Sequence, residues 1–459
     1  MELNLEFIST KLIKPSIPTP PHLKNYKLSF FDQLAEREHM PLLLFYPYGN
    51  NNDIDDDSFD QKLEKSLSRI LSHVYPAAGR LSRDRLSIDC LDQGVTFTKA
   101  KVNCQFNDFI DQVQNDLNLA LFFFPRDIQD LKDVDFDSTP PMVVQVTKFE
   151  CGGIAMSISA SHPVMDGFSN FKFVYEWAKV CKFEIPGDAI HFMSFDFGEI
   201  LPARDLSRIF PNRVHPVESE ERFIANRFFI TEQTISSLRD KLTGAIDSGE
   251  LCFKPSRVEI ITAILWRALI RVSEAKHGYL RRSLVFFPVN LRGRISLPLK
   301  ENAFGNYVMD APILFVPEKN KMELHDFVTL IRNSVQKAID ACAIGSADDI
   351  IANVANSYKE IFASKEWGTD NDEVDKCIIS SLCKFPMKDA DFGRGKPSLM
   401  HFGLRNFHSC WMYDAECGSI CVQVDLKDSY MSLFECQSDI KAFTNVLGNQ
   451  ERIQLQPLM

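Results

Sequence analysis

One histidine and one aspartate in the first half of the chain have the types and spacing that proton transfer needs. His162 and Asp166 lie in the string His-Pro-Val-Met-Asp-Gly, which ends at Gly167. Because an imidazole accepts and returns protons near neutral pH, His162 is a candidate general base. The spacing alone is a weak signal, and a histidine that ends a strand beside a solvated Asp166 is the structural alternative. The position of the string in the fold decides between the two interpretations.

The surrounding pattern predicts two strands and a helix. Apolar and polar residues alternate from Met142 to Phe149 and again from Ile154 to Ser161, and adjacent glycines in Glu150 to Gly153 supply a turn. Helical spacing begins at Phe168 and continues to Ala178. The string from His162 to Gly167 therefore connects the end of a strand to the start of a helix, where functional sites are commonly built.

A second unusual string, Asp391-Phe-Gly-Arg-Gly-Lys-Pro, lies near the C-terminus. Gly393, Gly395 and Pro397 around an aspartate predict a constrained turn, so Asp391 is interpreted as a salt-bridge partner rather than an acid catalyst. Asp391-Phe392-Gly393 also matches a kinase triplet, but the chain has no His-Arg-Asp catalytic loop and no kinase Gly-rich loop. A kinase is excluded.

Strands and helices mix along both halves of the chain, which predicts an α/β class with mixed sheets. The second half is predicted to contain a long helix from Arg257 to Lys276, opened by the capping-box pair Ser256 and Glu259. A stretch with several prolines and little periodicity separates the halves. The predicted domains are residues 1–190, with His162, and residues 221–459, with Asp391, joined by a linker over residues 191–220.

Composition excludes several classes of protein. The chain has 459 residues, 45% of them hydrophobic, and a net charge of −11, which argues against a dedicated nucleic-acid binder. Its 12 cysteines form no Cys-x-x-Cys pair, so no metal site is expected and reduced thiols are the simplest interpretation. No apolar run reaches the roughly 20 residues that span a bilayer, and the N-terminus lacks a signal-peptide pattern. A cytoplasmic protein that binds neither membrane nor nucleic acid is expected.

Phenylalanine is unusually abundant, with 37 residues against 10 tyrosines and 4 tryptophans. Such rings bring apolar bulk without a polar group, which suits a core or a deep apolar pocket equally.

Together the two strings resemble the BAHD family of plant acyl-CoA-dependent acyltransferases, which pairs His-x-x-x-Asp-Gly with a late Asp-Phe-Gly-Trp-Gly. The separation here is 391 − 162 = 229 residues, which fits a chain of this length. Smaller matches extend along most of the sequence: Lys14-Pro15, Thr19-Pro20, Leu28-Ser29, Asp32-Gln33, Phe45-Tyr46-Pro47, Tyr75 to Arg80, Cys151-Gly152-Gly153, Val289 to Arg292 and Gly305-Asn306.

The resemblance implies a two-domain fold like that of chloramphenicol acetyltransferase, with a channel between the domains and the histidine midway along it. It implies an enzyme of the EC 2.3.1 type that uses acyl-CoA as co-substrate, binds no permanent cofactor and acts as a monomer. His162 would take the proton of an acceptor hydroxyl as that oxygen attacks the thioester, and then return it to the leaving thiolate. No covalent acyl-enzyme is needed, so no cysteine has to be a nucleophile.

The resemblance also assigns roles to residues outside the first string. Ser380 matches a hydroxyl that stabilises the tetrahedral oxyanion, although an ordinary strand hydroxyl is the alternative. Asp166 would pair with Arg292 and orient the loop instead of relaying protons. The resemblance gives structural roles in the late turn to Asp391, Gly393 and Gly395.

Coenzyme A carries phosphate charges, whereas the chain is acidic overall, so a local basic segment is needed to bind it. Lys254, Ser256 and Arg257 open the predicted long helix, where free backbone amides favour anions. The family uses this segment for coenzyme A phosphates. Helix capping or a surface charge is the alternative for each residue.

Three positions depart from the family pattern. Arg394 and Leu382 stand where the family has tryptophan, and Lys388 stands where tyrosine is common. Because Arg394 adds a charge where a large ring usually packs, the contacts that hold the late turn are not predicted. An inactive member of the family stays an alternative.

Segments near the N-terminus and between Ser161 and Ser207 resemble acylsugar acyltransferases of nightshade-type plants. That resemblance implies sucrose or a partly acylated sucrose as the acceptor. Acetylation of an alkaloid or terpenoid alcohol is the second interpretation, and a non-catalytic binding module is the third.

Overall fold

The computed structural model describes most of the chain and divides it into two compact units. The described residues are 3–36, 38–48, 56–84, 86–125, 139–186, 193–206, 221–298, 300, 302–363, 374–403 and 407–444. The first unit comprises residues 1–208, 297–308 and 385–403, and the second comprises residues 209–296, 309–384 and 404–459.

The units do not follow contiguous ranges of the sequence. Residues 297–308 and 385–403 belong to the first unit, although the sequence analysis placed both in the domain at 221–459. The physical reason is strand pairing, because the short strand at Leu399–His401 joins the sheet of the first unit. The boundaries 1–190 and 221–459 stay a prediction, and most of the predicted linker 191–220 lies outside the described residues.

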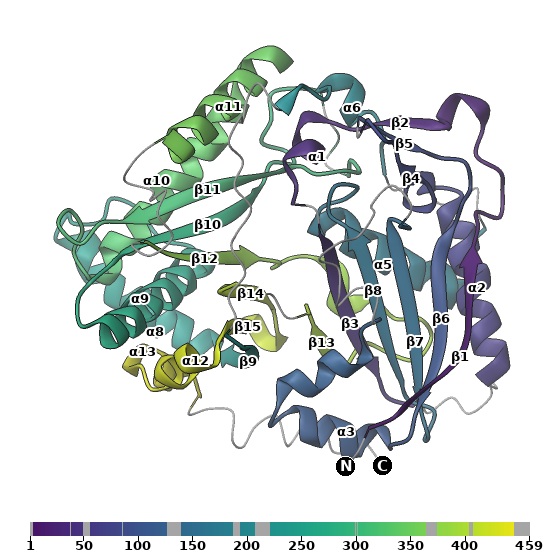
Figure 1. Ribbon diagram of the computed structural model, residues 1–459. Helices are drawn as coiled ribbons and strands as arrows, with labels where there is room; N and C mark the ends of the chain where they lie inside the picture. Colours follow the sequence, from purple (N-terminus) through teal and green to yellow (C-terminus); the bar gives the residue numbers. More distant parts are fainter. Residues whose placement is uncertain are drawn as a thin grey trace. The chain divides into compact units, whose positions relative to one another are not determined.

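A mixed six-stranded sheet forms the centre of the first unit, in the order β1-β6-β7-β8-β3-β13 (Figure 1). Its neighbours run antiparallel except β6 and β7, which are parallel. The elements of this unit are β1 (Leu5–Ile13), η1 (Pro21–Leu23), β2 (Asn25–Lys27), α1 (Phe30–Leu34), β3 (His39–Tyr46), α2 (Asp56–Leu71), η2 (Tyr75–Ala78), β4 (Arg80–Leu81), β5 (Ser87–Asp89), β6 (Val95–Val102), α3 (Phe106–Val113), η3 (Leu117–Phe123), β7 (Met142–Phe149), β8 (Ile154–Ser161), α5 (Gly167–Phe183), α6 (Phe197–Ile200), η7 (Pro386–Asp389) and β13 (Leu399–His401).

The strand-turn-strand-helix prediction around the histidine is confirmed. β7 and β8 are antiparallel neighbours, and α5 begins at Gly167, directly after the string. Helices α2 and α5 pack on each other. The side chains that α2 buries recur at the helical spacing seen in the sequence: Leu63, Leu67, Ile70 and Leu71.

Part of the phenylalanine excess forms a core cluster in the first unit. The rings of Phe109 and Phe123 are 4.8 Å apart, and Phe45 lies 5.4 and 5.5 Å from them. Phe149 joins the cluster 5.3 Å from Phe123. All four side chains are buried, so the interpretation of phenylalanine as core bulk is confirmed for these rings.

The second unit also contains a mixed six-stranded sheet, in the order β11-β10-β12-β14-β15-β9. β10, β12 and β14 run parallel, whereas β15 is antiparallel to β14 and β9. The elements are β9 (Phe223–Ile230), α8 (Glu232–Asp247), α9 (Arg257–His277), β10 (Arg282–Asn290), β11 (Val308–Phe315), α10 (Leu324–Ala343), α11 (Ala347–Ala363), β12 (Val374–Ser381), β14 (Ser409–Asp414), η8 (Glu416–Gly418), β15 (Ile420–Lys427), α12 (Asp428–Glu435) and α13 (Ser438–Thr444).

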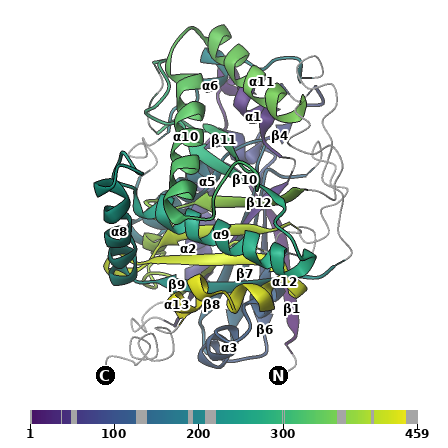
Figure 2. The same ribbon diagram turned by 90° about the vertical axis from the view of Figure 1, so that its left-hand side faces the viewer.

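Helices α8, α9 and α10 pack against one another in this unit (Figure 2). The predicted α9 is confirmed, including its capping box. Both units thus combine helices with a mixed sheet, and the predicted class is confirmed. In the part of the chain that the structure describes, every helix is too short or too polar to cross a membrane.

The short helix α6 ties two distant segments of the first unit together. Phe197 stacks on Tyr307 with the ring centroids 3.6 Å apart and lies 6.1 Å from Phe31 of α1. Gly198 lies so close to β2 that a Cβ atom there would sit 2.0 Å from the Lys27 carbonyl oxygen. The absence of a side chain at Gly198 is what lets α6 approach.

We predict that Gly198→Ala lowers the stability of the protein by about 1–3 kcal/mol, because the new methyl group must displace backbone. Gly244→Ala is the matched control, since a Cβ atom there meets nothing within 4 Å. That change removes a glycine from the interior of α8 and is expected to stabilise by about 0.5–1 kcal/mol. Urea unfolding of both variants measures the difference, and equal effects would contradict the assigned contact.

Candidate active site

The histidine of the first string lies on a short turn between β8 and α5. The His162 amide donates to the Glu38 carbonyl at 2.8 Å, which fixes the turn to the start of β3. The Val164 amide donates to the Ser161 carbonyl at 3.0 Å and closes the turn. His162 as a residue is half-buried.

Asn306 orients the imidazole of His162. Its Oδ1 lies 3.0 Å from His162 Nδ1, and its Nδ2 donates to the His162 carbonyl oxygen at 2.8 Å. The same Nδ2 donates to Asp32 Oδ1 at 2.9 Å. Because the amide nitrogen faces two acceptors, Oδ1 must face the ring, and Nδ1 must carry the proton that Oδ1 accepts. The lone pair of the neutral ring is therefore on Nε2.

A buried carboxylate holds Asn306 in place. Asp32 Oδ1 accepts from the Asn306 amide at 2.7 Å as well as from its side chain, and Oδ2 accepts from the Ser29 amide and hydroxyl at 2.8 and 2.7 Å. Ser29 is the N-cap of α1 and forms a capping box with Asp32. Burial raises the pKa of Asp32 to about 6, although these hydrogen bonds oppose the rise. Near neutral pH the group is a carboxylate satisfied by four donors.

Asp166 caps the helix that follows the turn. Its Oδ1 accepts from the Ser169 amide at 2.8 Å, and its Oδ2 accepts from the Tyr307 amide at 3.1 Å. Its side chain is 0% exposed, so the alternative with a solvated Asp166 is wrong. The capping contact favours α5 through the amides at its first turn. The predicted pair with Arg292, a residue of the second unit, stays a prediction.

Gly305 allows its segment to come close to the carboxylate. Its φ of +116° is a region that favours glycine, and a Cβ atom there would lie 3.2 Å from Asp32 Oδ1. The Gly305 carbonyl accepts from the Ser169 hydroxyl at 3.0 Å. The segment 305–307 therefore contacts both the start of α5 and the carboxylate of Asp32.

The late string forms a turn in the first unit. Asp391 Oδ1 accepts from the amides of Gly393 and Gly395 at 2.7 and 2.9 Å, and Oδ2 pairs with Lys182 Nζ at 2.6 Å. Both glycines have positive φ, +100° and +88°. Burial alone would raise the pKa of Asp391, but the bonds from Lys182 and Gly393 outweigh it and lower the pKa. Asp391 thus stabilises the turn while ionised.

Arg394 packs where the family has a tryptophan. Its guanidinium lies over the Phe59 ring, 4.1 Å from the centroid, and donates to the Gly152 carbonyl at 2.7 Å. A flat guanidinium can stack on a ring and use its N–H groups in the same plane. The late turn is therefore braced on α2 and on the turn between β7 and β8.

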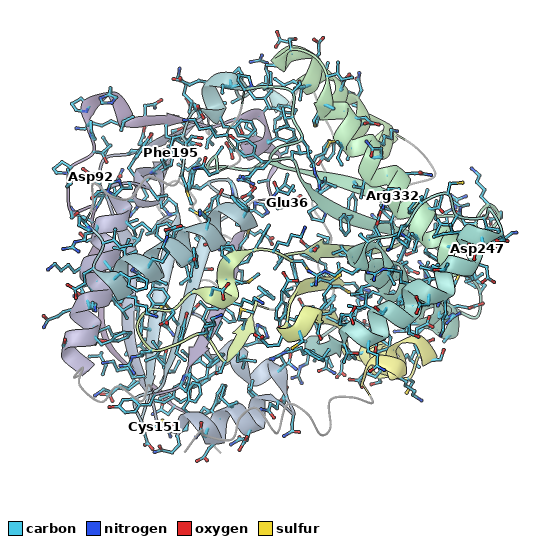
Figure 3. The ribbon with its side chains drawn as sticks, turned by 180° about the vertical axis from the view of Figure 1, so that it is seen from behind. Glu36, Asp92, Cys151, Phe195, Asp247 and Arg332 are labelled. Atoms are coloured by element: carbon cyan, nitrogen blue, oxygen red, sulfur yellow. The ribbon has the colours of Figure 1, made fainter. Side chains whose placement is uncertain are left out.

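In the second unit, Ser256 is the N-cap of α9. Its hydroxyl accepts from the Glu259 amide, and the Glu259 carboxylate accepts from the Ser256 amide at 2.8 Å. Arg332 of α10, labelled in Figure 3, donates to Glu259 Oε2 at 2.8 Å. The capping role considered for Ser256 is thus present.

The two basic residues beside Ser256, Lys254 and Arg257, differ in their polar contacts. Arg257 forms an ion pair with Asp414 and donates to the Gly418 carbonyl at 3.2 Å. Lys254 is exposed. Within the described residues, Lys254 makes no hydrogen bond or ion pair, whereas Arg257 makes both.

The remaining candidates also lie in the second unit. Ser380 is on β12 opposite Trp411 of β14 and is 7% exposed. Arg292 follows β10, and its amide and guanidinium donate to Asn290 Oδ1 at 3.1 and 3.4 Å. Leu382 is buried, and its amide donates to the Met412 carbonyl.

Sequence reasoning missed the two residues that orient His162. Asp32 and Asn306 belong to two of the short family matches, Asp32-Gln33 and Gly305-Asn306, but the sequence assigned neither residue a role in the site. Ser29-x-x-Asp32 is a capping-box spacing, so the local structure at Asp32 was detectable. Nothing in the sequence links Asn306 to His162, 144 positions away.

The described residues contain no group of three histidine, cysteine, aspartate or glutamate side chains that could hold a metal ion. Separately, His162, Asn306 and Asp32 form a continuous hydrogen-bonded chain in the first unit.

Known proteins resemble the chain over nearly its whole length. A family model described as the Transferase family matches residues 3–440. Vinorine synthase from Rauvolfia serpentina is 30% identical over 399 residues, which cover 86% of this chain and 87% of the relative. Limonoid 7-O-acetyltransferase from Citrus sinensis is 31% identical over 417 residues, which cover 85% of this chain and 86% of the relative.

Solved structures share the fold. The crystal structure of vinorine synthase matches with a TM-score of 0.77 and 27% identity, covering 96% of this chain and 98% of the other. TRI101 from F. graminearum, solved with coenzyme A and deoxynivalenol, matches with a TM-score of 0.66 and 14% identity. It covers 91% of this chain and 98% of the other, and supports the fold alone.

We predict that Asp32 makes stability depend on pH between about 4 and 6. Its folded pKa of about 6 exceeds the ordinary value of 3.8, so in this window the folded chain keeps a proton that the unfolded chain releases. Asp32 therefore adds fully to the free energy of unfolding below pH about 4. This stabilisation is lost as the pH rises to about 6, and the change is on the order of 3 kcal/mol.

Asp32→Asn has no carboxyl at this position and serves as the reference. The unfolding free energy of the wild type minus that of the variant should fall as the pH rises through this window. A constant difference, measured by urea unfolding at each pH, would show that Asp32 is not a buried carboxyl with a raised pKa.

Proposed function

The chain belongs to the Transferase family, the plant BAHD acyl-CoA-dependent acyltransferases that its motifs resemble, and on this premise we propose its reacting residues and its acceptor. It is an acyltransferase of the EC 2.3.1 type that uses acyl-CoA as co-substrate. Its relatives include O-acetyltransferases and a malonyltransferase, which supports the proposal that this chain also transfers the acyl group to oxygen.

We propose that His162 is the general base in a ternary complex of enzyme, acyl-CoA and acceptor. The observation that supports this most is the hydrogen bond to Asn306 at Nδ1, which leaves Nε2 as the proton acceptor. Nε2 takes the hydroxyl proton as the acceptor oxygen bonds to the thioester carbonyl carbon. When the tetrahedral intermediate breaks its carbon–sulfur bond, the proton returns to the thiolate, and an ester and free coenzyme A leave.

Asn306 and Asp32 act as positioning residues in this proposal. As His162 becomes an imidazolium, its Nδ1–H bond to Asn306 Oδ1 strengthens. The Asp32 carboxylate accepts from the Asn306 amide nitrogen and polarises the amide toward the ring. Both contacts stabilise the charge that forms during proton transfer.

The other assignments follow the family resemblance. Ser380 is the proposed donor to the oxyanion, and Asp166 with Arg292 orients the loop. Asp391 stabilises the late turn, and its contacts with Lys182 and two backbone amides support a structural role. Gly393 and Gly395 shape that turn through their positive φ angles.

For coenzyme A phosphates we propose Lys254 as the principal contact. It is exposed, and it precedes a helix N-terminus, where anions are favoured. The Ser256 amide donates to Glu259 and its hydroxyl oxygen caps the helix, so the hydroxyl hydrogen is the group that we propose for a phosphate contact. Arg257 is already paired with Asp414, so its contribution to phosphate binding is expected to be smaller.

The proposed acceptor is a hydroxyl of sucrose or of a partly acylated sucrose. It is supported by the resemblance of the segments near the N-terminus and after Ser161 to acylsugar enzymes. An alkaloid or terpenoid alcohol is the second candidate, because vinorine synthase, salutaridinol 7-O-acetyltransferase and limonoid O-acetyltransferases are among the relatives.

We further propose a monomer that works in the cytoplasm. His162, Asn306 and Asp32 all come from one unit of one chain, so no second copy is needed to complete the base. All 12 cysteines are free, as in a reducing compartment.

We predict that the enzyme releases thiol from acetyl-CoA or isobutyryl-CoA when sucrose or a partly acylated sucrose is added, and that His162→Ala lowers kcat by about 10²- to 10⁴-fold. The panel includes an alkaloid and a terpenoid alcohol, and mass spectrometry identifies each ester. Asn306→Ala keeps the base but loses its orientation, so a smaller loss with an altered pH profile is expected.

Several outcomes would contradict parts of the proposal. A near-normal rate of His162→Ala would exclude the general base, and turnover of the alkaloid or terpenoid alcohol alone would replace the sugar acceptor. No turnover of any acceptor would favour the binding-module alternative.

We predict that Lys254→Ala raises the KM for acyl-CoA by roughly three- to tenfold at low salt, and by less at high salt, because an exposed charge is screened. The KM for the acceptor should not change. Lys241→Ala removes another exposed lysine of the same unit and is the matched control. Equal KM values for both variants would exclude Lys254 as a phosphate contact.

A further inference from the structure

The peptide group that joins Gly305 to Asn306 is held at both of its ends. Its carbonyl oxygen, on Gly305, accepts from the Ser169 hydroxyl at 3.0 Å. Its N–H, on Asn306, donates to Asp32 Oδ1 at 2.7 Å. A peptide group is planar, and its carbonyl and N–H point in opposite directions. Two partners on opposite sides therefore fix the rotation of the plane and, with it, the position from which the Asn306 side chain starts.

Gly305 makes this restraint from outside the segment necessary. Its φ is +116°, and glycine adopts such angles as readily as negative ones. The conformation of residue 305 therefore does not by itself select one orientation of the peptide group that follows it. That selection is made by the hydrogen bonds from Ser169 and to Asp32.

Asn306 transmits this orientation to His162. Its Oδ1 lies 3.0 Å from His162 Nδ1, and its Nδ2 donates to the His162 carbonyl oxygen at 2.8 Å. Hydrogen bonds weaken steeply when their angles change. A rotation of the Gly305–Asn306 peptide group would move both side-chain atoms and would loosen the contact that selects the tautomer of the imidazole.

The helix that contains Ser169 does not require its hydroxyl. The cap of α5 uses the amide of Ser169, which donates to Asp166 Oδ1 at 2.8 Å and would be kept by any residue but proline. Alanine also has the higher helix propensity. Because the Ser169 side chain is 0% exposed, its hydroxyl makes no contact with solvent either. The bond to the Gly305 carbonyl is what the hydroxyl contributes.

We propose that Ser169 is a positioning residue for the general base, because its hydroxyl keeps Asn306 Oδ1 on His162 Nδ1 through the Gly305–Asn306 peptide group. This inference rests on the proposed function. His162 and Ser169 belong to one continuous segment, the turn after β8 and the first turn of α5. The hydroxyl therefore ties the segment that orients the imidazole to the same turn that carries it.

The test compares the kinetics of the wild-type enzyme, Ser169→Ala, Asn306→Ala and the double variant with the best acceptor of the panel. Ser169→Ala should lower kcat by about three- to tenfold, and the KM values for acyl-CoA and acceptor should stay within about twofold. Because Ser169 acts through Asn306, the double variant should be no slower than Asn306→Ala alone. Losses that multiply in the double variant would contradict the inference.

A spectroscopic signal separates positioning from stability. In enzyme labelled with ¹⁵N-histidine, the resonances that disappear in His162→Ala belong to His162, and their shifts report which ring nitrogen carries the proton. At about pH 8, where a histidine of ordinary pKa is neutral, the wild type should show the proton on Nδ1. Ser169→Ala should show a mixture of the two tautomers.

Ser68→Ala is the matched control. The Ser68 hydroxyl also joins a helix of the first unit to a distant backbone carbonyl, since it donates from α2 to the Lys14 carbonyl at 2.7 Å. Both variants lose one such bond and should lower the melting temperature by similar small amounts. Only Ser169→Ala should change kcat and the tautomer of His162.

The outcomes separate this inference from the proposed function. If His162→Ala is inactive but Ser169→Ala keeps the wild-type kcat and tautomer, the general base stands and the role of Ser169 is wrong. A melting temperature far below that of Ser68→Ala, with the tautomer unchanged, would show a structural role instead. If His162→Ala keeps a near-normal rate, the proposed function fails, and the positioning role with it.

Discussion

The buried carboxylate of Asp32 is the constraint on which the candidate active site depends. An ionised group in the protein interior is tolerated only if donors surround it, and this one receives four from Ser29 and Asn306. Those donors come from segments more than 270 residues apart in the sequence. Satisfying one charge therefore draws two distant segments together and, through the amide of Asn306, sets the orientation of the imidazole of His162.

Local patterns predicted the elements that carry the histidine, but not the residues that orient it. The alternation in β7 and β8 and the helical spacing after Phe168 are periodic patterns. Such a pattern can be read from one segment without knowing what the segment packs against. Asn306 has no such signal, because its role exists only when residues 305–307 lie against Asp32 and Asp166. The pairing of β13 with β3, which assigns residues 385–403 to the first unit, likewise leaves no periodic signal in that segment.

The departures from the family pattern are compatible with an intact site in the first unit. Arg394 replaces the bulk of a tryptophan ring with a guanidinium stacked on Phe59, and it adds a hydrogen bond to Gly152 that an indole could make only with its single N–H. In the second unit, α9 begins with a complete capping box, and Arg257 is committed to Asp414. Of the two basic residues proposed for phosphate binding, Lys254 is the one without an ion pair in the described residues.

The return of residues 385–403 to the first unit has a consequence for synthesis on the ribosome. A unit made from one continuous stretch can fold as soon as that stretch has emerged, which is the usual order for N-terminal domains. Here the sheet that carries His162 lacks its edge strand β13 until residue 401 has been made, and Asp32 lacks half of its donors until residue 306 has been made. During translation, the sheet of the first unit therefore keeps an unpaired edge at β3 until most of the second unit has been synthesised.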